Sequence, residues 1–220
     1  MVVRRFCRLD SLDGASYFSV PISGDVKESV NESLLFVQRF LKSSGKVGSV
    51  VPSSKYLVRA IIEKIPFETS ATIVELGGGT GTITDALVKK KNDKSALLVF
   101  EPDDQFFGII EKKYSGKRGV TILQKKAQEL LSTLRKMNAG YADCIVSSIP
   151  FASLGRKTSG RILAEIQRSL APGGSFILYQ YTVFTLPLIL KYFRIRKFSY
   201  VVRNVPPALV FVCSSKKHAS

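Results

Sequence analysis

Residues that build metal centres and disulfide frameworks are scarce in this sequence. It contains three cysteines, Cys7, Cys144 and Cys213, which lie far apart and form no C-x-x-C pair. Its single histidine, His218, stands two residues before the last residue. We therefore expect a protein of a reduced, cytosolic compartment with no metal site. We do not expect a histidine to act as a general base, because the last residues of a chain are seldom held in place.

Acidic residues are missing from the last quarter of the sequence. No aspartate or glutamate follows Glu165, whereas the same stretch holds eight lysines and arginines, and the formal net charge is +16. A surface of one sign attracts a polyanion, which is either nucleic acid or an anionic membrane. The alternative is that the charge serves solubility alone.

Long hydrophobic runs are also absent. Met1 to Asp10 is charged and does not resemble a signal peptide. The most apolar stretch, Phe176 to Phe193, is interrupted by Gln180 and Pro187, so we do not expect it to cross a membrane. With 220 residues, of which 45% are hydrophobic, the chain is expected to fold as one globular domain with a small appendage.

The N-terminal part of the chain has the pattern of an amphipathic helix. Asp25-x-x-Glu28 resembles a capping box, and apolar residues follow at helical spacing from Val26 to Leu41. A second helix is expected after Ser54, with a serine as its N-cap, and is expected to end near Lys64. We assign residues 1–52 to an N-terminal arm and amphipathic helix, which either contacts a membrane or covers the sheet and its ligand cleft as a lid. Residues 53–220 are assigned to the main domain.

From Thr72 onward, strand patterns alternate with helix patterns. Such alternation predicts an α/β fold with a Rossmann-like, seven-stranded, mostly parallel sheet and helices on both faces. The expected strands are Ile73–Leu76, Ala96–Phe100, Val120–Leu123, Ala142–Ser147, Ser175–Tyr181, Phe198–Arg203 and Ala208–Cys213. The expected helices are Thr82–Lys90, Asp103–Tyr114, Ala127–Met137, Thr158–Leu170 and Leu186–Phe193.

A glycine-rich turn follows the first of these strands, with the spacing E-x-G-x-G-x-G from Glu75 to Gly81. A dinucleotide fingerprint would need glycine where Thr82 stands, and a phosphate-binding P-loop would need lysine there. Glycines in such a turn let the backbone bend sharply against a ligand at the carboxyl end of a strand. Glu75 would repel a pyrophosphate, but it can pair with the ammonium of an amino-acid moiety.

Glu101 ends the second strand, and an acid at this place can accept the two hydroxyls of a ribose. An ammonium at one acid and a ribose at the other describe S-adenosylmethionine, which leaves as S-adenosylhomocysteine after methyl transfer. The alternative is a turn with no ligand.

Together these features resemble the class I S-adenosylmethionine-dependent methyltransferases, over about Ser53 to Cys213. In that family an acid often follows the third strand and meets the adenine, whereas Lys126 stands here. We expect the adenine contact from the backbone of Lys126–Ala127 or from Gln124. The resemblance implies these cofactor-binding residues: Glu75, Gly77, Gly78, Gly79, Thr80, Gly81, Glu101, Lys126, Ala127 and Ser147.

The expected acceptor site begins at Ser147-Ser148-Ile149-Pro150-Phe151, which resembles the N-[LI]-P-[FY] element of methyltransferases that act on amino groups of nucleic acids. In that element the polar side chain and the carbonyl before proline hold the amine, and the aromatic ring covers it. Ser148 replaces the asparagine, which weakens a nucleobase interpretation.

Tyr179 and Tyr181 close the fifth strand, and alternation points both side chains the same way. They either surround a methylated ammonium or pack in the core. We name Ser148, Phe151, Tyr179 and Tyr181 as the candidate catalytic residues.

The chain also resembles the bacterial phospholipid N-methyltransferases, which methylate phosphatidylethanolamine. The matching stretches are Gly48–Ser54, the glycine turn, Ser147–Pro150, Leu170–Gly174, Gln180–Tyr181 and Asn204–Ala208. This resemblance implies a cytoplasmic enzyme on the inner face of the membrane, which contacts anionic lipid through its N-terminal helix and methylates an amine-bearing phospholipid.

Two alternatives remain open. One is an RNA adenine N6-methyltransferase, which the positive charge and the I-P-F element favour. Against it, the expected catalytic fold takes up almost the whole chain, so we expect no C-terminal helical RNA-binding domain. The other is a non-catalytic basic binding module on the same fold. Oligomeric state is not readable from the sequence.

Overall fold

The structure is a computed structural model that describes residues 11–12, 15–16 and 53–216. The helix expected between Asp25 and Ser43 lies outside the described residues. The short strands β1 (Ser11–Leu12) and β2 (Ala15–Ser16) pair antiparallel with each other.

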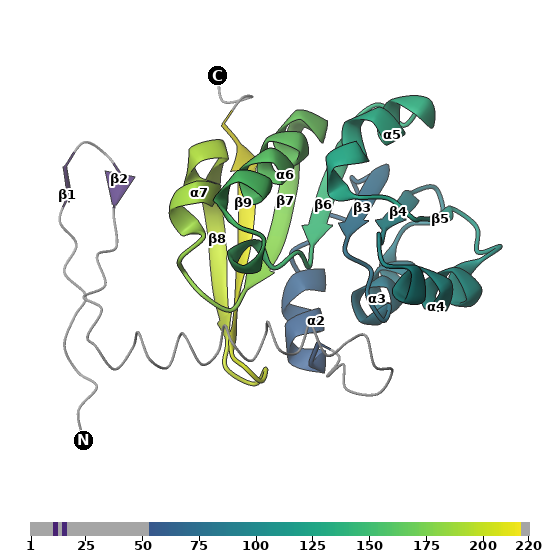
Figure 1. Cartoon of the computed structure of the whole chain (residues 1–220), viewed down its shortest axis with the longest axis horizontal. Helices are drawn as coiled ribbons and strands as arrows, with labels where there is room; N and C mark the ends of the chain where they lie inside the picture. The colour runs from purple at the N-terminus through teal and green to yellow at the C-terminus, as the bar shows by residue number, and fades with distance from the viewer. Residues whose placement is uncertain (1–10, 13–14, 17–52, 217–220) are drawn as a thin grey trace.

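A seven-stranded sheet forms the centre of the main domain, in the order β5-β4-β3-β6-β7-β9-β8 (Figure 1). All neighbouring strands are parallel except β9, which is antiparallel to both β7 and β8. This confirms the predicted seven-stranded, mostly parallel sheet. The strands are β3 (Thr72–Leu76), β4 (Ala96–Phe100), β5 (Val120–Leu123), β6 (Ala142–Ser147), β7 (Leu170–Gln180), β8 (Phe193–Val201) and β9 (Ala208–Ser215).

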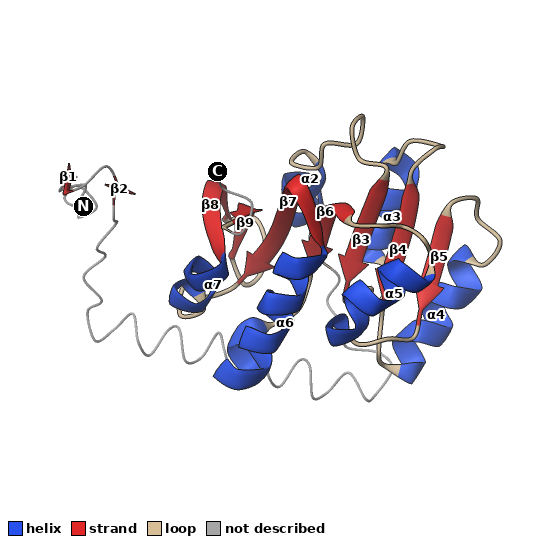
Figure 2. Ribbon diagram, turned by 90° about the horizontal axis from the view of Figure 1, so that it is seen from above, coloured by secondary structure: helices blue, strands red, loops and turns tan. Residues whose placement is uncertain are grey.

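Helices cover both faces of this sheet, as predicted (Figure 2). One face carries α2 (Lys55–Ile62), α3 (Thr82–Lys90) and α4 (Asp104–Tyr114). The other face carries α5 (Leu130–Lys136), α6 (Arg156–Ser169) and α7 (Leu186–Tyr192), with short 3₁₀ turns η1 (Ala127–Glu129) and η2 (Phe151–Ser153). No helix among the described residues is long and apolar enough to cross a membrane.

Two strands begin earlier than the sequence predicts. β7 starts at Leu170, which pairs with Ala142 before a register shift brings Cys144 opposite Ser175. The predicted helix extended one residue too far, to Leu170, because β7 already begins there. The Pro-Gly-Gly sequence that follows is typical of a turn, so the sequence did not indicate a strand in this stretch. β8 starts at Phe193, directly after α7, and contains a second register shift between Ile195 and Lys197.

The order of the strands places a ligand site at one edge of the sheet. β3 has β4 on one side and β6 on the other, so the chain reverses its winding direction there. In open α/β sheets, ligands bind outside the carboxyl ends of the strands at such a switch point. The glycine turn after β3 and Glu101 after β4 both stand at this edge.

Candidate active site

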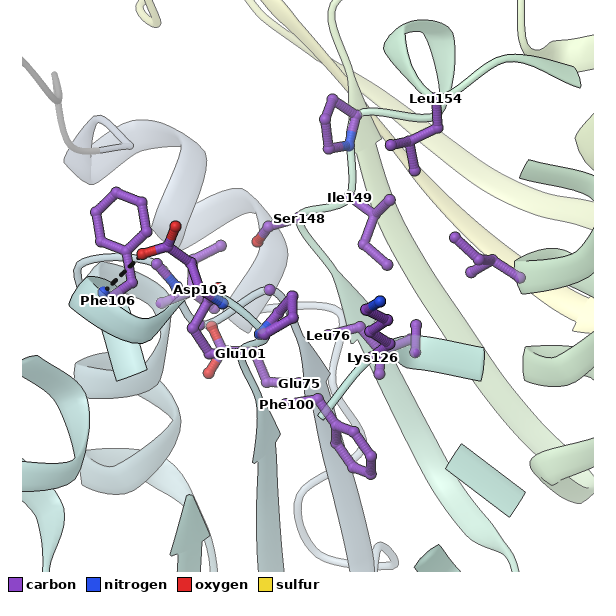
Figure 3. A pocket seen from close by; sticks show the side chains of 18 of the residues that line it. Glu75, Leu76, Phe100, Glu101, Asp103, Phe106, Lys126, Ser148, Ile149 and Leu154 are labelled. Carbon is purple, nitrogen blue, oxygen red and sulfur yellow. Dashed lines mark hydrogen bonds between the residues drawn. The ribbon is translucent and has the colours of Figure 1, made fainter. Parts of the chain in front are cut away.

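A cavity of about 490 Å³ opens at the carboxyl ends of β3, β4, β6 and β7. This volume is in the range of small-molecule and cofactor sites. Figure 3 shows acidic side chains on one side of the cavity and apolar side chains with Lys126 on the other. Predicted site residues that line it are Glu75, Gly77, Gly78, Gly79, Thr80, Glu101, Lys126, Ala127, Ser148, Tyr179 and Tyr181.

The glycine turn is fixed by the backbone and by packing. The N–H of Gly77 donates to the carbonyl of Phe100 at 2.8 Å, which ties the turn to β4. Gly77 and Gly79 have positive φ angles of 86° and 53°, which favour glycine. A Cβ on Gly78 would stand 2.7 Å from Ile110 Cδ1. At Gly78 the requirement for glycine therefore comes from the close approach of α4 beneath the turn.

Glu75 is a fully buried carboxyl group that has only part of its hydrogen bonding satisfied. Its Oε2 accepts a hydrogen bond from Thr84 Oγ1 at 2.7 Å, whereas Oε1 has no partner among the described residues. Burial raises the pKa of Glu75 to about 8, because the charged form loses its hydration. A buried, partly unpaired carboxyl that lines a cavity fits the ammonium group of a ligand.

Glu101 is held in place by two backbone hydrogen bonds. Its Oε2 accepts from the N–H of Gly79 at 2.7 Å, and its Oε1 accepts from the N–H of Asp103 at 3.0 Å. Burial raises its pKa, and the two backbone donors oppose that shift. Each carboxylate oxygen still has a lone pair available, so Glu101 can accept hydroxyl donors from a ribose.

The N-terminus of α4 adds two residues that the sequence analysis did not predict. Asp103 caps this helix by accepting from the N–H groups of Gln105 and Phe106 at 3.0 and 3.1 Å. Both Asp103 and Phe106 line the cavity and stand beside Glu101 (Figure 3). The sequence predicted a helix from Asp103 to Tyr114, but it contained no signal that the Phe106 ring faces a ligand.

The residues after β5 contribute through Lys126 and Ala127, which line the cavity as expected. The N–H of Lys126 already donates to Glu129 Oε1 at 3.0 Å. Gln124 does not line the cavity, and its side-chain amide donates to Asp104 on α4. The prediction that Gln124 contacts adenine is therefore wrong, which leaves the backbone at Ala127 as the remaining candidate from this loop.

Three predicted site residues do not line the cavity. Ser147 is fully buried, and its Oγ accepts from the N–H of Ile149 at 3.2 Å, so it stabilises the turn after β6 from the interior. Phe151 is part of the hydrophobic core, so its ring does not cover an acceptor as predicted. Gly81 packs against Ile110 and Tyr114 at the start of α3. In each case the residue has the expected position along the chain but faces the interior.

The carbonyl before Pro150 is saturated with hydrogen bonds. The oxygen of Ile149 accepts from the N–H of Phe151 at 3.0 Å and from Gln180 Nε2 at 3.0 Å. Gln180 is buried and also donates to the carbonyl of Tyr179 at 2.6 Å. A carbonyl oxygen has two lone pairs, so in this arrangement Ile149 has no acceptor left for the amine of a substrate.

Tyr179 and Tyr181 meet at the end of β7 that faces the cavity. Their ring centroids are 5.7 Å apart and the rings are inclined at 81°, an edge-to-face contact. Burial raises the pKa of Tyr181, whose hydroxyl also interacts with Asn204 and Tyr179. The cavity also has an apolar wall formed by residues that the sequence analysis did not predict, including Leu154 and Ile162, and Thr158 lines it as well.

Comparisons with known proteins agree with this site. Residues 73–174 match the family model described as a methyltransferase domain. The structure resembles that of the N-methyltransferase NodS from Bradyrhizobium japonicum, solved with S-adenosyl-L-homocysteine, with a TM-score of 0.56 at 11% identity over 88% of each chain. The fold, the family match and the two carboxylates define the class: the chain is an S-adenosylmethionine-dependent methyltransferase.

Several curated relatives are similar in sequence, among them two methyltransferases. The first, an ornithine lipid N-methyltransferase from Singulisphaera acidiphila, is 26% identical over 195 residues, which cover 86% of this chain and all of that enzyme. The second, ribosomal RNA small subunit methyltransferase A from a Hydrogenobaculum species, is 29% identical over 112 residues. That match covers half of this chain and 40% of the relative, so the likeness is limited to part of that enzyme.

Proposed function

We propose that the chain transfers a methyl group from S-adenosylmethionine to the amine of a lipid head group at an anionic membrane surface on the cytoplasmic side. Candidate acceptors are phosphatidylethanolamine and an ornithine lipid, which both present a primary amine. The similarity to the ornithine lipid enzyme over its whole length supports this class of acceptor.

The observation that carries the proposal is the hydrogen bonding of the Ile149 carbonyl. The resemblance to enzymes that methylate nucleobases implies that this carbonyl and an asparagine hold the amino group. Here Gln180 and the Phe151 N–H occupy the carbonyl, and Ser148 stands in place of the asparagine. The acceptor end of the cavity therefore offers two tyrosines and an apolar wall, which suit an aliphatic amine on a lipid better than a planar base.

Glu75 and Glu101 would hold and orient S-adenosylmethionine from one side of the cavity. The bound cofactor would supply an electrophilic methyl group on a sulfonium, which would pass to the amine lone pair as the S–C bond breaks, with S-adenosylhomocysteine as the product. The apolar wall and the tyrosines exclude water, and their main contribution is to align the amine with the methyl group.

The lipid amine must lose a proton before it can attack. Tyr181 is protonated at neutral pH, as a phenol ordinarily is, and burial raises its pKa further. It therefore acts as a relay, in which the phenol oxygen accepts the ammonium proton while its hydroxyl proton passes to water or to the lipid phosphate. The rings of Tyr179 and Tyr181 also attract the methylated ammonium, by roughly 0.5–2 kcal/mol for each ring.

Incubation of the full chain with methyl-labelled S-adenosylmethionine and either mixed lipids or ribosomal RNA tests the proposal. We expect label in the lipid fraction. Tyr181→Phe and Tyr179→Ala should lower turnover by about tenfold or more, with cofactor affinity near the wild-type value. Tyr141→Phe, an exposed tyrosine at the amino end of β6, is the matched control and should behave as wild type. Unchanged turnover in both cavity variants would contradict their assigned role.

The second candidate function is methylation of an adenine N6 group in RNA. It is favoured by the similarity to the ribosomal RNA methyltransferase and by the net charge of +16. Label in RNA and none in lipid would establish this alternative and refute the lipid proposal.

A further inference from the structure

The turn between β8 and β9, residues 202–207, exposes apolar side chains to solvent. Val202 is 65% exposed and Val205 is 79% exposed. Tyr200, which stands at the end of β8 just before the turn, is 59% exposed. Large apolar side chains concentrated on one exposed turn indicate a surface that contacts an apolar partner, such as a membrane or another protein.

The topology places this turn beside the mouth of the cavity. β7 and β8 are both antiparallel to β9, so they run parallel to each other and end at the same edge of the sheet. In Figure 1 the turn extends beyond this edge, next to α2. Asn204 accepts a hydrogen bond from the N–H of Ser54 at 3.1 Å, and it also interacts with the Tyr181 hydroxyl. Asn204 therefore links the turn that carries the exposed valines to Tyr181 at the acceptor end of the cavity.

The charges around the turn select the kind of partner. Arg203 is exposed, and its guanidinium lies 5.3 Å above the ring of Tyr56 on α2. The exposed cations Arg196 and Lys197 lie farther back on β8, four or more residues before its end at Val201, and the sequence contains no acidic residue after Glu165. Cations that flank exposed aromatic and aliphatic side chains match a bilayer with anionic head groups. A nucleic acid would pair with the cations, but it would leave the valines in water.

We propose that Tyr200, Val202, Arg203 and Val205, with Tyr56 of α2, form a docking surface for an anionic lipid bilayer. Val202 and Val205 enter the interfacial region, Tyr200 and Tyr56 lie at head-group level, and Arg203 contacts lipid phosphates. The inference rests on the proposed function, because it specifies how a lipid head group is brought to the cavity. It assigns membrane contact to the described domain in addition to the helix expected before residue 52.

Sedimentation of the full chain with vesicles measures this contact. The vesicles contain either phosphatidylcholine alone or phosphatidylcholine with about one third phosphatidylglycerol. The double variant Val202→Asp/Val205→Asp should bind the anionic vesicles at least about tenfold more weakly, because two apolar anchors become anions. The control Met137→Asp/Tyr141→Asp changes two exposed apolar residues at the opposite edge of the sheet and should bind like wild type. Equal binding by all three proteins would overturn the proposal.

A second measurement does not depend on charged substitutions. The sequence contains no tryptophan, so Val205→Trp introduces a single fluorescent reporter into the turn. Its emission should shift to the blue when anionic vesicles are added and should stay constant with ribosomal RNA. Met137→Trp, the control, should not respond to vesicles. A chain that sediments with vesicles while the emission of Val205→Trp is unchanged would place the contact elsewhere and refute the docking surface.

Two readouts separate this inference from the proposed function. Unchanged S-adenosylmethionine affinity in the aspartate double variant shows that the cavity is intact, because Val202 and Val205 do not line it. If wild type binds vesicles through the turn but transfers label to no lipid, the proposed function fails and the docking surface stands. If lipid is methylated equally by wild type and the double variant in vesicles, the docking surface fails and the proposed function stands.

Discussion

Replacing Glu75 by glutamine should stabilise the free protein and abolish its cofactor binding. Glu75 is fully buried, has an unpaired Oε1, and has a pKa raised to about 8. Glutamine has nearly the same shape and can still accept the hydrogen bond from Thr84, but it carries no charge at any pH. The variant Glu75→Gln therefore removes the cost of ionisation and also removes the partner of the cofactor ammonium.

The magnitude follows from the difference between the folded and unfolded pKa values of Glu75, which are about 8 and 4.5. Between these values the folded protein binds more protons than the unfolded chain, so the free energy of unfolding falls as pH rises. Compared with its value at low pH, where Glu75 is protonated in both states, the free energy of unfolding of the wild type is lower by about 1 kcal/mol at pH 5 and by about 3 kcal/mol at pH 7. The stability difference between Glu75→Gln and wild type should therefore increase by about 2 kcal/mol from pH 5 to pH 7.

Urea unfolding of both proteins without cofactor, at pH 5, 6 and 7, measures this difference. Comparison at each pH cancels the titration of all other groups. Glu63→Gln, which changes an exposed glutamate just after α2, is the control and should differ from wild type by no more than about 1 kcal/mol at each pH. A difference between Glu75→Gln and wild type that stays constant from pH 5 to pH 7 would refute the raised pKa of Glu75.

Cofactor binding should depend on the same proton. At pH 7 only about one Glu75 in ten is ionised in the free protein, so pairing with the cofactor ammonium releases about one proton. The affinity for S-adenosylmethionine should rise by nearly tenfold from pH 6 to pH 7. Calorimetry in buffers with different ionisation enthalpies measures the proton directly. Binding without proton release at pH 7 would show that the ammonium is held elsewhere.

Three further changes give defined outcomes. Gly78→Ala should destabilise the fold by about 1–3 kcal/mol, because its Cβ meets the core, whereas Gly108→Ala, which meets nothing within 4 Å, should not; urea unfolding measures both. Glu101→Gln should lower S-adenosylmethionine affinity by about tenfold or more. The backbone N–H groups of Gly79 and Asp103 each donate to one Glu101 oxygen, and glutamine offers an oxygen to only one of them while its amide N–H groups oppose the other. Gln180→Leu should free the Ile149 carbonyl and lower turnover on the lipid amine while S-adenosylmethionine affinity is kept; equal turnover in initial-rate assays would refute the importance of this hydrogen bond.

The fold could be predicted from the sequence because its signals are local. The parallel strands β3, β4 and β6 are short, mostly apolar runs, and all five residues of β3 are buried. The errors occur at Leu170 and Phe193, where the strands begin. At both places a register shift or a directly adjoining helix interrupts the alternation of buried and exposed side chains by which a strand is recognised in a sequence. Pairing with a neighbouring strand, which is a long-range property, decides those boundaries.

The cofactor side of the site was predictable for a related reason. The carboxyl ends of parallel strands lie at one edge of the sheet, so Glu75 near the end of β3 and Glu101 after β4 lie near each other even though they are far apart in sequence. The direction of a side chain in an irregular turn has no such signal. Ser147 and Phe151 face the interior, while Phe106 and Leu154 face the cavity. The hydrogen bond from Gln180 to Ile149 spans 31 positions, and no sequence pattern marks it.

The contacts of Asn204 determine how far the amine of a lipid must extend from the membrane to reach the cavity. Its side chain accepts from the N–H of Ser54 and donates to the carbonyl of Pro206 at 2.7 Å, while it also interacts with Tyr181. One amide thus joins the start of α2, the β8–β9 turn and the acceptor end of the cavity. With the turn seated in a bilayer, this clamp fixes the height of the Tyr181 hydroxyl above the lipid surface. The enzyme would then select lipids whose amine extends far enough from the glycerol or acyl region to reach Tyr181 at this fixed height.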